Sequence, residues 1–157
     1  MITESKETVS TSFQIVCFKI GIEEYSIDIL KVQEILKIPK VTKLPKAKGY
    51  ILGVIDLRGK VIPIVDLSKR FNVVSGKVSS ESRVIVVDIG GKQIGLAIDS
   101  VSHVVKIDSN EVEPPPPVVK GISGKYIVGI AKLQDGFVVI LDISQIFSAE
   151  ELATIEG

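Results

Sequence analysis

The sequence is poor in the residues that carry most protein chemistry. Its 157 residues include one cysteine, one histidine and no tryptophan. The single Cys17 excludes an internal disulfide and a zinc site built from several cysteines. The single His103 removes most histidine-based metal and nucleophilic chemistry. We therefore expect no catalytic residue, no bound metal and no cofactor.

The chain also lacks net charge, aromatic rings and long apolar runs. It has 19 Lys and Arg against 19 Asp and Glu, so no overall field attracts nucleic acid or an anionic membrane. Aromatic residues make up 5% of the chain, too few for a base-stacking platform. No apolar run approaches the roughly 18 residues of a membrane span, and residues 1–12 lack a signal-peptide pattern. We expect a cytoplasmic protein with a flexible start, which neither binds nucleic acid nor inserts into a membrane.

Residues with branched β-carbons dominate the apolar fraction. The chain has 24 Ile and 22 Val against 10 Leu and 5 Ala. Such side chains are stiff and pack well on a pleated surface, so this composition predicts an all-β protein.

Two segments of the chain repeat internally. Residues 15–36 align without gaps with residues 84–105, and residues 49–71 align with residues 125–147. Each copy reads as short strands separated by glycine turns. Five short strands cannot cover two faces as an open sheet, whereas closure into a barrel removes the exposed edges. We therefore predict two five-stranded barrels related by a pseudo-twofold axis, with short connecting and C-terminal helices.

The repeat also predicts the domain boundaries. The first barrel is expected over residues 13–78 and the second over residues 79–147, with a helix or tail over residues 148–157. The serine- and glycine-rich segment 73–81 is the expected connection. The first strand could instead pair with the other barrel, because periodicity does not decide between the two.

Two aspartates occupy matching places in the copies, Asp66 and Asp142. Each stands where a short helix could begin, so the favoured interpretation is a helix cap. The alternative is a small hydrolase in which the two carboxylates share a proton. That chemistry needs tight turns that bring the carboxylates together, and the glycine that usually follows is missing from both copies.

Three other features, a lysine-rich segment, His103 and Cys17, are interpreted as structural. Five lysines between positions 37 and 48 are expected on a solvated loop; a nucleic-acid site is the alternative, and its affinity would fall steeply with salt. His103 is expected to be an ordinary outward-facing strand residue, and Cys17 a small core residue without a base to activate it.

Positions at which the copies differ are candidates for a task that only one copy performs. Glu34 stands where the second copy has His103, and Arg58 stands where it has Gln134. Matched apolar residues could line a groove near the axis, namely Ile29 with Ile98 and Val32 with Val101. An apolar groove with charges at its rim suits an amphipathic helix. Binding is therefore a better hypothesis than catalysis.

Several motifs then resemble those of the CheW family of bacterial chemotaxis coupling proteins. They are VQEI at 32–35, VTKLP at 41–45, GYILGVIDLRGKVIPIVDL at 49–67 and YIVGIAKLQDGFVVILDI at 126–143. The family's usual Asn-Leu-Arg-Gly departs at its first position, Asp56, while Arg58 and Gly59 are kept.

This resemblance implies two Src-homology-like barrels in a non-catalytic scaffold that links transmembrane chemoreceptors to the histidine kinase CheA. It implies a receptor hairpin tip in a groove between the barrels, at Val16, Ile29, Val32, Glu34, Ile35, Arg58 and Ile98. It implies contacts with the regulatory domain of the kinase near Val41, Leu44 and Val118, and recruitment to receptor arrays at the inner face of the membrane. A CheW-like module of another signalling pathway is the alternative.

Overall fold

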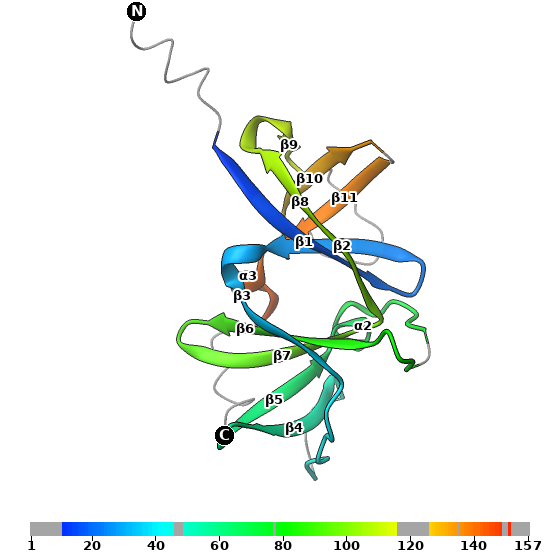
Figure 1. Ribbon diagram of the computed structural model, residues 1–157, viewed down its shortest axis with the longest axis vertical. Coiled ribbons are helices and arrows are strands. Elements are labelled where there is room, and N and C mark those ends of the chain that lie inside the picture. Colours follow the sequence, from blue (N-terminus) through cyan, green and yellow to red (C-terminus); the bar gives the residue numbers. More distant parts are fainter. Residues whose placement is uncertain are drawn as a thin grey trace, which may run out of the picture.

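The chain folds into two β-sheets stacked along the long axis of the molecule (Figure 1), as the composition and repeat predict. The structure is a computed structural model, and no helix among its described residues is both long and apolar enough to cross a membrane. It describes residues 11–45, 49–76, 78–115, 126–134, 136–148 and 151.

One sheet, which we call barrel A, occupies the upper half of Figure 1. Its strand order is β8-β1-β2-β11-β10-β9. The bounds of these strands are β1 Ser12–Ile20, β2 Glu23–Asp28, β8 Ser100–Asp108, β9 Val112–Glu113, β10 Ile127–Leu133 and β11 Gly136–Leu141.

The other sheet, barrel B, occupies the lower half, with strand order β3-β6-β7-β5-β4. Its strands are β3 Val32–Lys37, β4 Ile51–Leu57, β5 Lys60–Asp66, β6 Arg83–Ile89 and β7 Lys92–Ile98. Among the described residues, short helical segments complete the fold, namely η1 Ile29–Lys31, α2 Leu67–Phe71, η2 Ser109–Glu111 and α3 Ile143–Ile146.

The predicted boundary between residues 78 and 79 is wrong, because the two halves of the chain exchange hairpins. The β1–β2 hairpin pairs with β8 and β11 of the second half. The β6–β7 hairpin pairs with β3 and β5 of the first half. Each barrel therefore has a central hairpin from one copy and its remaining strands from the other. The sequence left open whether the first strand pairs with the other barrel, and in the structure the whole β1–β2 hairpin does so.

The exchange follows the internal repeat residue by residue. Val16 lies opposite Val104 in barrel A, and the equivalent Ile85 lies opposite Ile35 in barrel B. The β1–β8 pairing has a register shift between Cys17 and Phe18 of β1, and the β3–β6 pairing has its counterpart between Val32 and Glu34 of β3. These matches support the predicted pseudo-twofold relation between the barrels.

Both sheets close on themselves through the segment that follows one edge strand, β8 in barrel A and β3 in barrel B. Thr42 bridges to Val54 in barrel B, and Glu113 pairs with the equivalent Ile130 in barrel A. A glycine stands beside each closure. A Cβ on Gly53 would lie 2.2 Å from the Thr42 carbonyl oxygen, and one on Gly129 would lie 2.7 Å from that of Glu113. This close approach explains why the two copies share glycine at these positions.

Three apolar clusters of described residues hold the fold together. One fills barrel A around Ile15 and Ile140, and one fills barrel B around Ile62 and Ile64. The third, which we call the central cluster, lies between the barrels. Its buried members are Val16, Phe18, Ile20, Tyr25, Ile27, Val65, Leu67, Phe71, Ile85, Val87, Ile89, Ile94, Leu96, Ile98, Ile127, Leu141, Ile143, Ile146 and Phe147.

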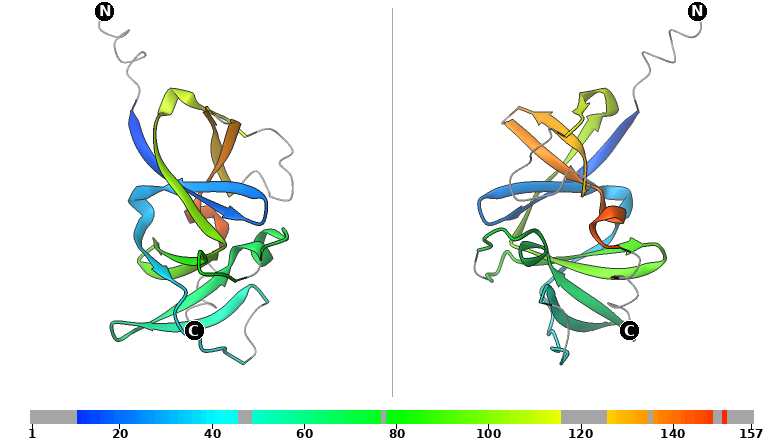
Figure 2. Two further views of the ribbon diagram at one scale, coloured as in Figure 1. Left: turned by 45° about the vertical axis from the view of Figure 1, so that its right-hand side comes forward. Right: turned by 180° about the vertical axis from the view of Figure 1, so that it is seen from behind.

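The barrels meet near α2 and α3, as the ribbon views show (Figure 2), and an arginine of α2 breaks the symmetry there. The Arg70 guanidinium carbon lies 5.1 Å from the ring centroid of Tyr50 and 5.3 Å from that of Phe147. Its Nη2 donates to the Ile146 carbonyl at 2.6 Å and to Glu151 at 2.9 Å. Cation–π contact and charge-assisted hydrogen bonds thus tie the first half of the chain to the end of the second.

The two repeated aspartates are helix caps, as the favoured interpretation held. Asp66 accepts from the Ser68 amide at 3.0 Å, and Asp142 accepts from the Ser144 amide at 3.1 Å. Each carboxylate also accepts from the hydroxyl of its own serine. These local contacts account for both aspartates and give the hydrolase alternative no support.

The hairpin exchange predicts fragment complementation. Residues 1–78 and 79–157, produced separately, each lack the hairpin that forms the middle of their own barrel. We expect each fragment alone to show no cooperative unfolding transition by circular dichroism. A 1:1 mixture should regain strand signal and a single transition. Independent cooperative unfolding of either fragment would contradict the exchange.

Candidate partner-binding surface

The two charged positions that distinguish the first copy lie together. Glu34 is on β3, and Arg58 occupies the turn between β4 and β5 with a φ of 51°. Arg58 Nη1 donates to Glu34 Oε2 at 3.4 Å, and Nη2 donates to Oε1. This hydrogen bonding raises the pKa of the exposed Arg58 guanidinium. The Asp56 carboxylate accepts from the Gly59 amide at 2.9 Å and so fixes the turn.

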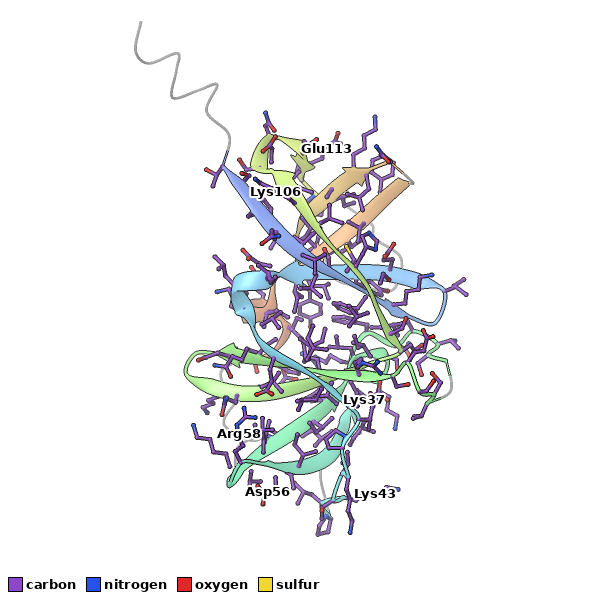
Figure 3. The ribbon with its side chains drawn as sticks, viewed as in Figure 1. Lys37, Lys43, Asp56, Arg58, Lys106 and Glu113 are labelled. Atoms are coloured by element: carbon purple, nitrogen blue, oxygen red, sulfur yellow. The ribbon has the colours of Figure 1, made fainter. Side chains whose placement is uncertain are left out.

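This ion pair and the predicted apolar residues lie on different faces of barrel B. Glu34 pairs with Val86, which belongs to the cluster inside the barrel. Ile35 pairs with Ile85, which belongs to the central cluster. Directly opposed residues share a face of the sheet, so Glu34 is on the inner face and Ile35 on the face toward barrel A. Figure 3 shows Arg58 in the lower barrel, away from the level at which the barrels meet.

Two of the predicted receptor contacts are buried in the central cluster. Val16 is 1% exposed and Ile98 is 3% exposed. Both belong to strands of exchanged hairpins, whose outer faces meet between the barrels. The expected open trough at the axis is therefore filled by the protein's own side chains, and neither residue presents a surface to a partner.

The remaining apolar residues form a ridge where the chain crosses from barrel A to barrel B. Ile29 and Val32 are half-buried against the central cluster, and Ile35 is 39% exposed. Leu30, which the sequence analysis did not select, is 84% exposed. We call Ile29, Leu30, Val32 and Ile35 the crossover ridge. Leu30 was missed because η1 interrupts the two-residue alternation from which exposure was predicted.

The two predicted kinase contacts that the structure describes, Val41 and Leu44, have different surroundings. Val41 is half-buried against the cluster inside barrel B, next to the bridge at Thr42. Leu44 is 43% exposed. Val118 lies outside the described residues. Lys37 and Lys43 are exposed in the same barrel (Figure 3), as a solvated basic segment predicts.

A comparison with known protein families identifies the family of this chain. The family model described as the CheW-like domain matches residues 14–151. The chain belongs to the CheW-like domain family. It is 35% identical to the chemotaxis protein CheW of Klebsiella aerogenes over 96% of this chain and 90% of that protein. It is 34% identical to the chemotaxis protein CheW of Treponema pallidum over 89% and 85%.

A solved structure extends this similarity to three dimensions. The scaffolding protein TtCheW of Thermoanaerobacter tengcongensis matches with a TM-score of 0.83 and 39% identity, over 92% of this chain and 93% of that one. The CheW-like fold therefore spans both barrels, and the exchanged hairpins are part of it.

The only thiol of this CheW-like chain, Cys17, is chemically quiet by itself. Its side chain is fully buried in barrel A. Burial raises the pKa of the Cys17 thiol to about 11, and the Glu24 carboxylate adds to the rise. The thiol is therefore protonated near neutral pH and is a poor nucleophile.

The raised thiol pKa predicts a loss of stability at alkaline pH. The ordinary value is 9.0 and the folded value is about 11, so between them only the unfolded chain loses the proton. The free energy of unfolding should be unaffected below about pH 9 and should fall by about 1 to 3 kcal/mol as pH rises to about 11.

Urea unfolding of the native chain and of Cys17→Val across this pH range measures the effect. Valine is the residue at the equivalent position 86 of barrel B, so the variant should fold. Tyr25, whose pKa burial also raises, is present in both proteins and cancels in their difference. Parallel stability curves for the two proteins would contradict the assignment.

Proposed function

We propose that this protein is a non-catalytic adaptor of bacterial chemotaxis, which couples transmembrane chemoreceptors to the histidine kinase CheA. The observation that carries the proposal is the match of nearly the whole chain, through both barrels, to chemotaxis and scaffolding proteins of the CheW family. The adaptor works in the cytoplasm and is recruited to receptor arrays at the inner face of the membrane.

A binding role is supported because the side chains that could act in catalysis have structural roles instead. Asp66 and Asp142 cap helices, and Cys17 is a protonated thiol inside a barrel. By contrast, large apolar side chains are exposed on the crossover ridge. Exposed apolar surface of this kind is typical of interaction sites, so the argument favours contact with another protein over a reaction.

The receptor tip, an α-helical hairpin, is proposed to dock on the crossover ridge. Leu30 and Ile35 supply exposed apolar surface, and Ile29 and Val32 support them from the central cluster. An amphipathic helix can bury its apolar stripe on such a ridge. Glu34 and Arg58 neutralise each other at the neighbouring barrel end and would orient a charged side chain of the receptor.

The regulatory domain of the kinase is proposed to dock on barrel B near Val41 and Leu44, while the third predicted contact, Val118, lies outside the described residues. Of the two described residues in this set, Leu44 is the exposed one and Val41 is half-buried. Val41 packs against the cluster inside barrel B, and the bridge between Thr42 and Val54 fixes the segment. This position is separate from the crossover ridge, so one molecule can contact a receptor and a kinase together.

Receptor binding should be sensitive to the ridge and to Arg58. Ile35→Asp and Arg58→Ala should each weaken binding to a receptor hairpin fragment by about 10-fold, because they remove an anchor and a positioning charge. Val104→Asp and Gln134→Ala change the equivalent positions of barrel A and serve as matched controls. Calorimetric titration measures the affinities. Equal affinity for the test variants and the native chain would contradict the surface assigned to the receptor.

Kinase binding should be sensitive to Leu44. Leu44→Asp should weaken capture of the isolated kinase regulatory domain by about 10-fold, while receptor binding stays unchanged. Ile22→Asp, at a side chain that is 96% exposed in the β1–β2 turn, is the control. If Leu44→Asp lowers receptor binding equally, the two sites are not separate.

A further inference from the structure

The open end of barrel A carries a second group of functional side chains. A cavity of about 430 Å³ lies there between β2, β8, β10 and β11. Glu24 and His103 line it, and Cys17 of β1 lies next to them. The proposed receptor and kinase contacts use none of the three residues.

Strand register directs these three side chains to one place. Cys17 lies opposite His103 on β8 and opposite Ser26 on β2. Glu24 is two residues from Ser26 on the same strand, so it projects from the same face. That face is the inner one, because Cys17 belongs to the cluster inside barrel A. His103 is therefore on the inner face, where its side chain is half exposed at the barrel mouth. The expectation that His103 faces outward is wrong.

The distances bring three different ligand atoms together. The Cys17 Sγ, a ring nitrogen of His103 and a carboxylate oxygen of Glu24 all lie within 4.8 Å of one another. His103 Nδ1 is 4.0 Å from Glu24 Oε2. This is the one such trio of metal-ligating types in the part of the chain that the structure describes.

We propose that Cys17, Glu24 and His103 bind one divalent metal ion of the zinc class at the mouth of barrel A. Thiolate, imidazole and carboxylate are the ligands that zinc takes in proteins, and three protein ligands leave a fourth, open position toward the cavity. Metal–ligand bonds of about 2.0 to 2.3 Å require the donor atoms to approach by about 1 Å. The partly exposed side chains of Glu24 and His103 can rotate to do so.

Binding is balanced in charge and protons. The Cys17 thiol gives its proton to solvent as the sulfur–metal bond forms. Two lysines that line the cavity, Lys106 and Lys132, are matched by Glu24 and Glu111, so the cavity presents no net positive charge to a cation.

The internal repeat provides a comparison within the molecule. The equivalent residues of barrel B are Val86, Gln93 and Glu34, which include neither a thiol nor an imidazole. Glu34 is held by Arg58. The substitution of His103 for Glu34 between the copies thus has a specific purpose in barrel A. The residue count of the sequence predicted no metal site. A count does not show which residues are neighbours, and the β1–β8 pairing places the lone Cys17 beside the lone His103.

Titration of the purified full chain with Zn²⁺ and Co²⁺ tests the proposal. We expect one Zn²⁺ per chain and a rise in the thermal midpoint with Zn²⁺ concentration, since the ion joins strands of both halves. Co²⁺ should give a thiolate-to-metal charge-transfer band and the visible absorption of a four-coordinate ion. A native chain that shows no saturable binding of Zn²⁺ would overturn the proposal.

Single variants identify the ligands. Cys17→Val and Glu24→Gln introduce the residues of barrel B, and both they and His103→Gln should lower Zn²⁺ affinity by about 100-fold or more. Cys17→Val should also abolish the charge-transfer band. Gln134→Ala, which changes a neutral side chain of the cavity outside the trio, is the matched control and should bind like the native chain. Full affinity in Glu24→Gln and His103→Gln would overturn the assignment even if Cys17→Val failed to fold.

Discussion

The β1–β2 and β6–β7 hairpins each complete a barrel whose other strands come from the opposite half of the chain. One face of each hairpin covers its own barrel interior, and the other face meets its counterpart in the central cluster. The β-branched composition serves this arrangement, because a strand that is buried on both faces needs apolar residues at consecutive positions. The crossover ridge exists for the same reason, since the chain must pass from one barrel to the other at η1.

Much of the fold could be predicted because the chain contains the same unit twice. The shared tyrosines and phenylalanines pair across the axis, Tyr50 with Phe147 and Tyr126 with Phe71. The shared aspartates cap equivalent helices. Repeated identities therefore marked positions that both barrels need. The repeat could not reveal which hairpin belonged to which barrel, because contiguous and exchanged arrangements bury the same residues.

The functional residues were harder to predict for reasons of geometry. Val16 and Ile98 are apolar residues of matched copies, but a strand pattern alone does not distinguish a side chain in a sealed interface from one in a groove. Cys17 and His103 are far apart in the sequence and become neighbours only through the exchange. Differences between the copies were the better guide, since Glu34 and Arg58 form an ion pair and the counterpart of Glu34, His103, lies at the mouth of barrel A.

Arg70 gives the pair of barrels a mechanical property. Its guanidinium is wedged between rings of both halves and anchors a carbonyl and a carboxylate near the end of the chain. Sliding or bending at the junction between the barrels would break the hydrogen bonds of Arg70. It would also disrupt the pairing of the exchanged hairpins with their neighbouring strands. The junction between the barrels is accordingly braced against sliding and bending, so the two ends of the molecule keep a fixed spacing and angle.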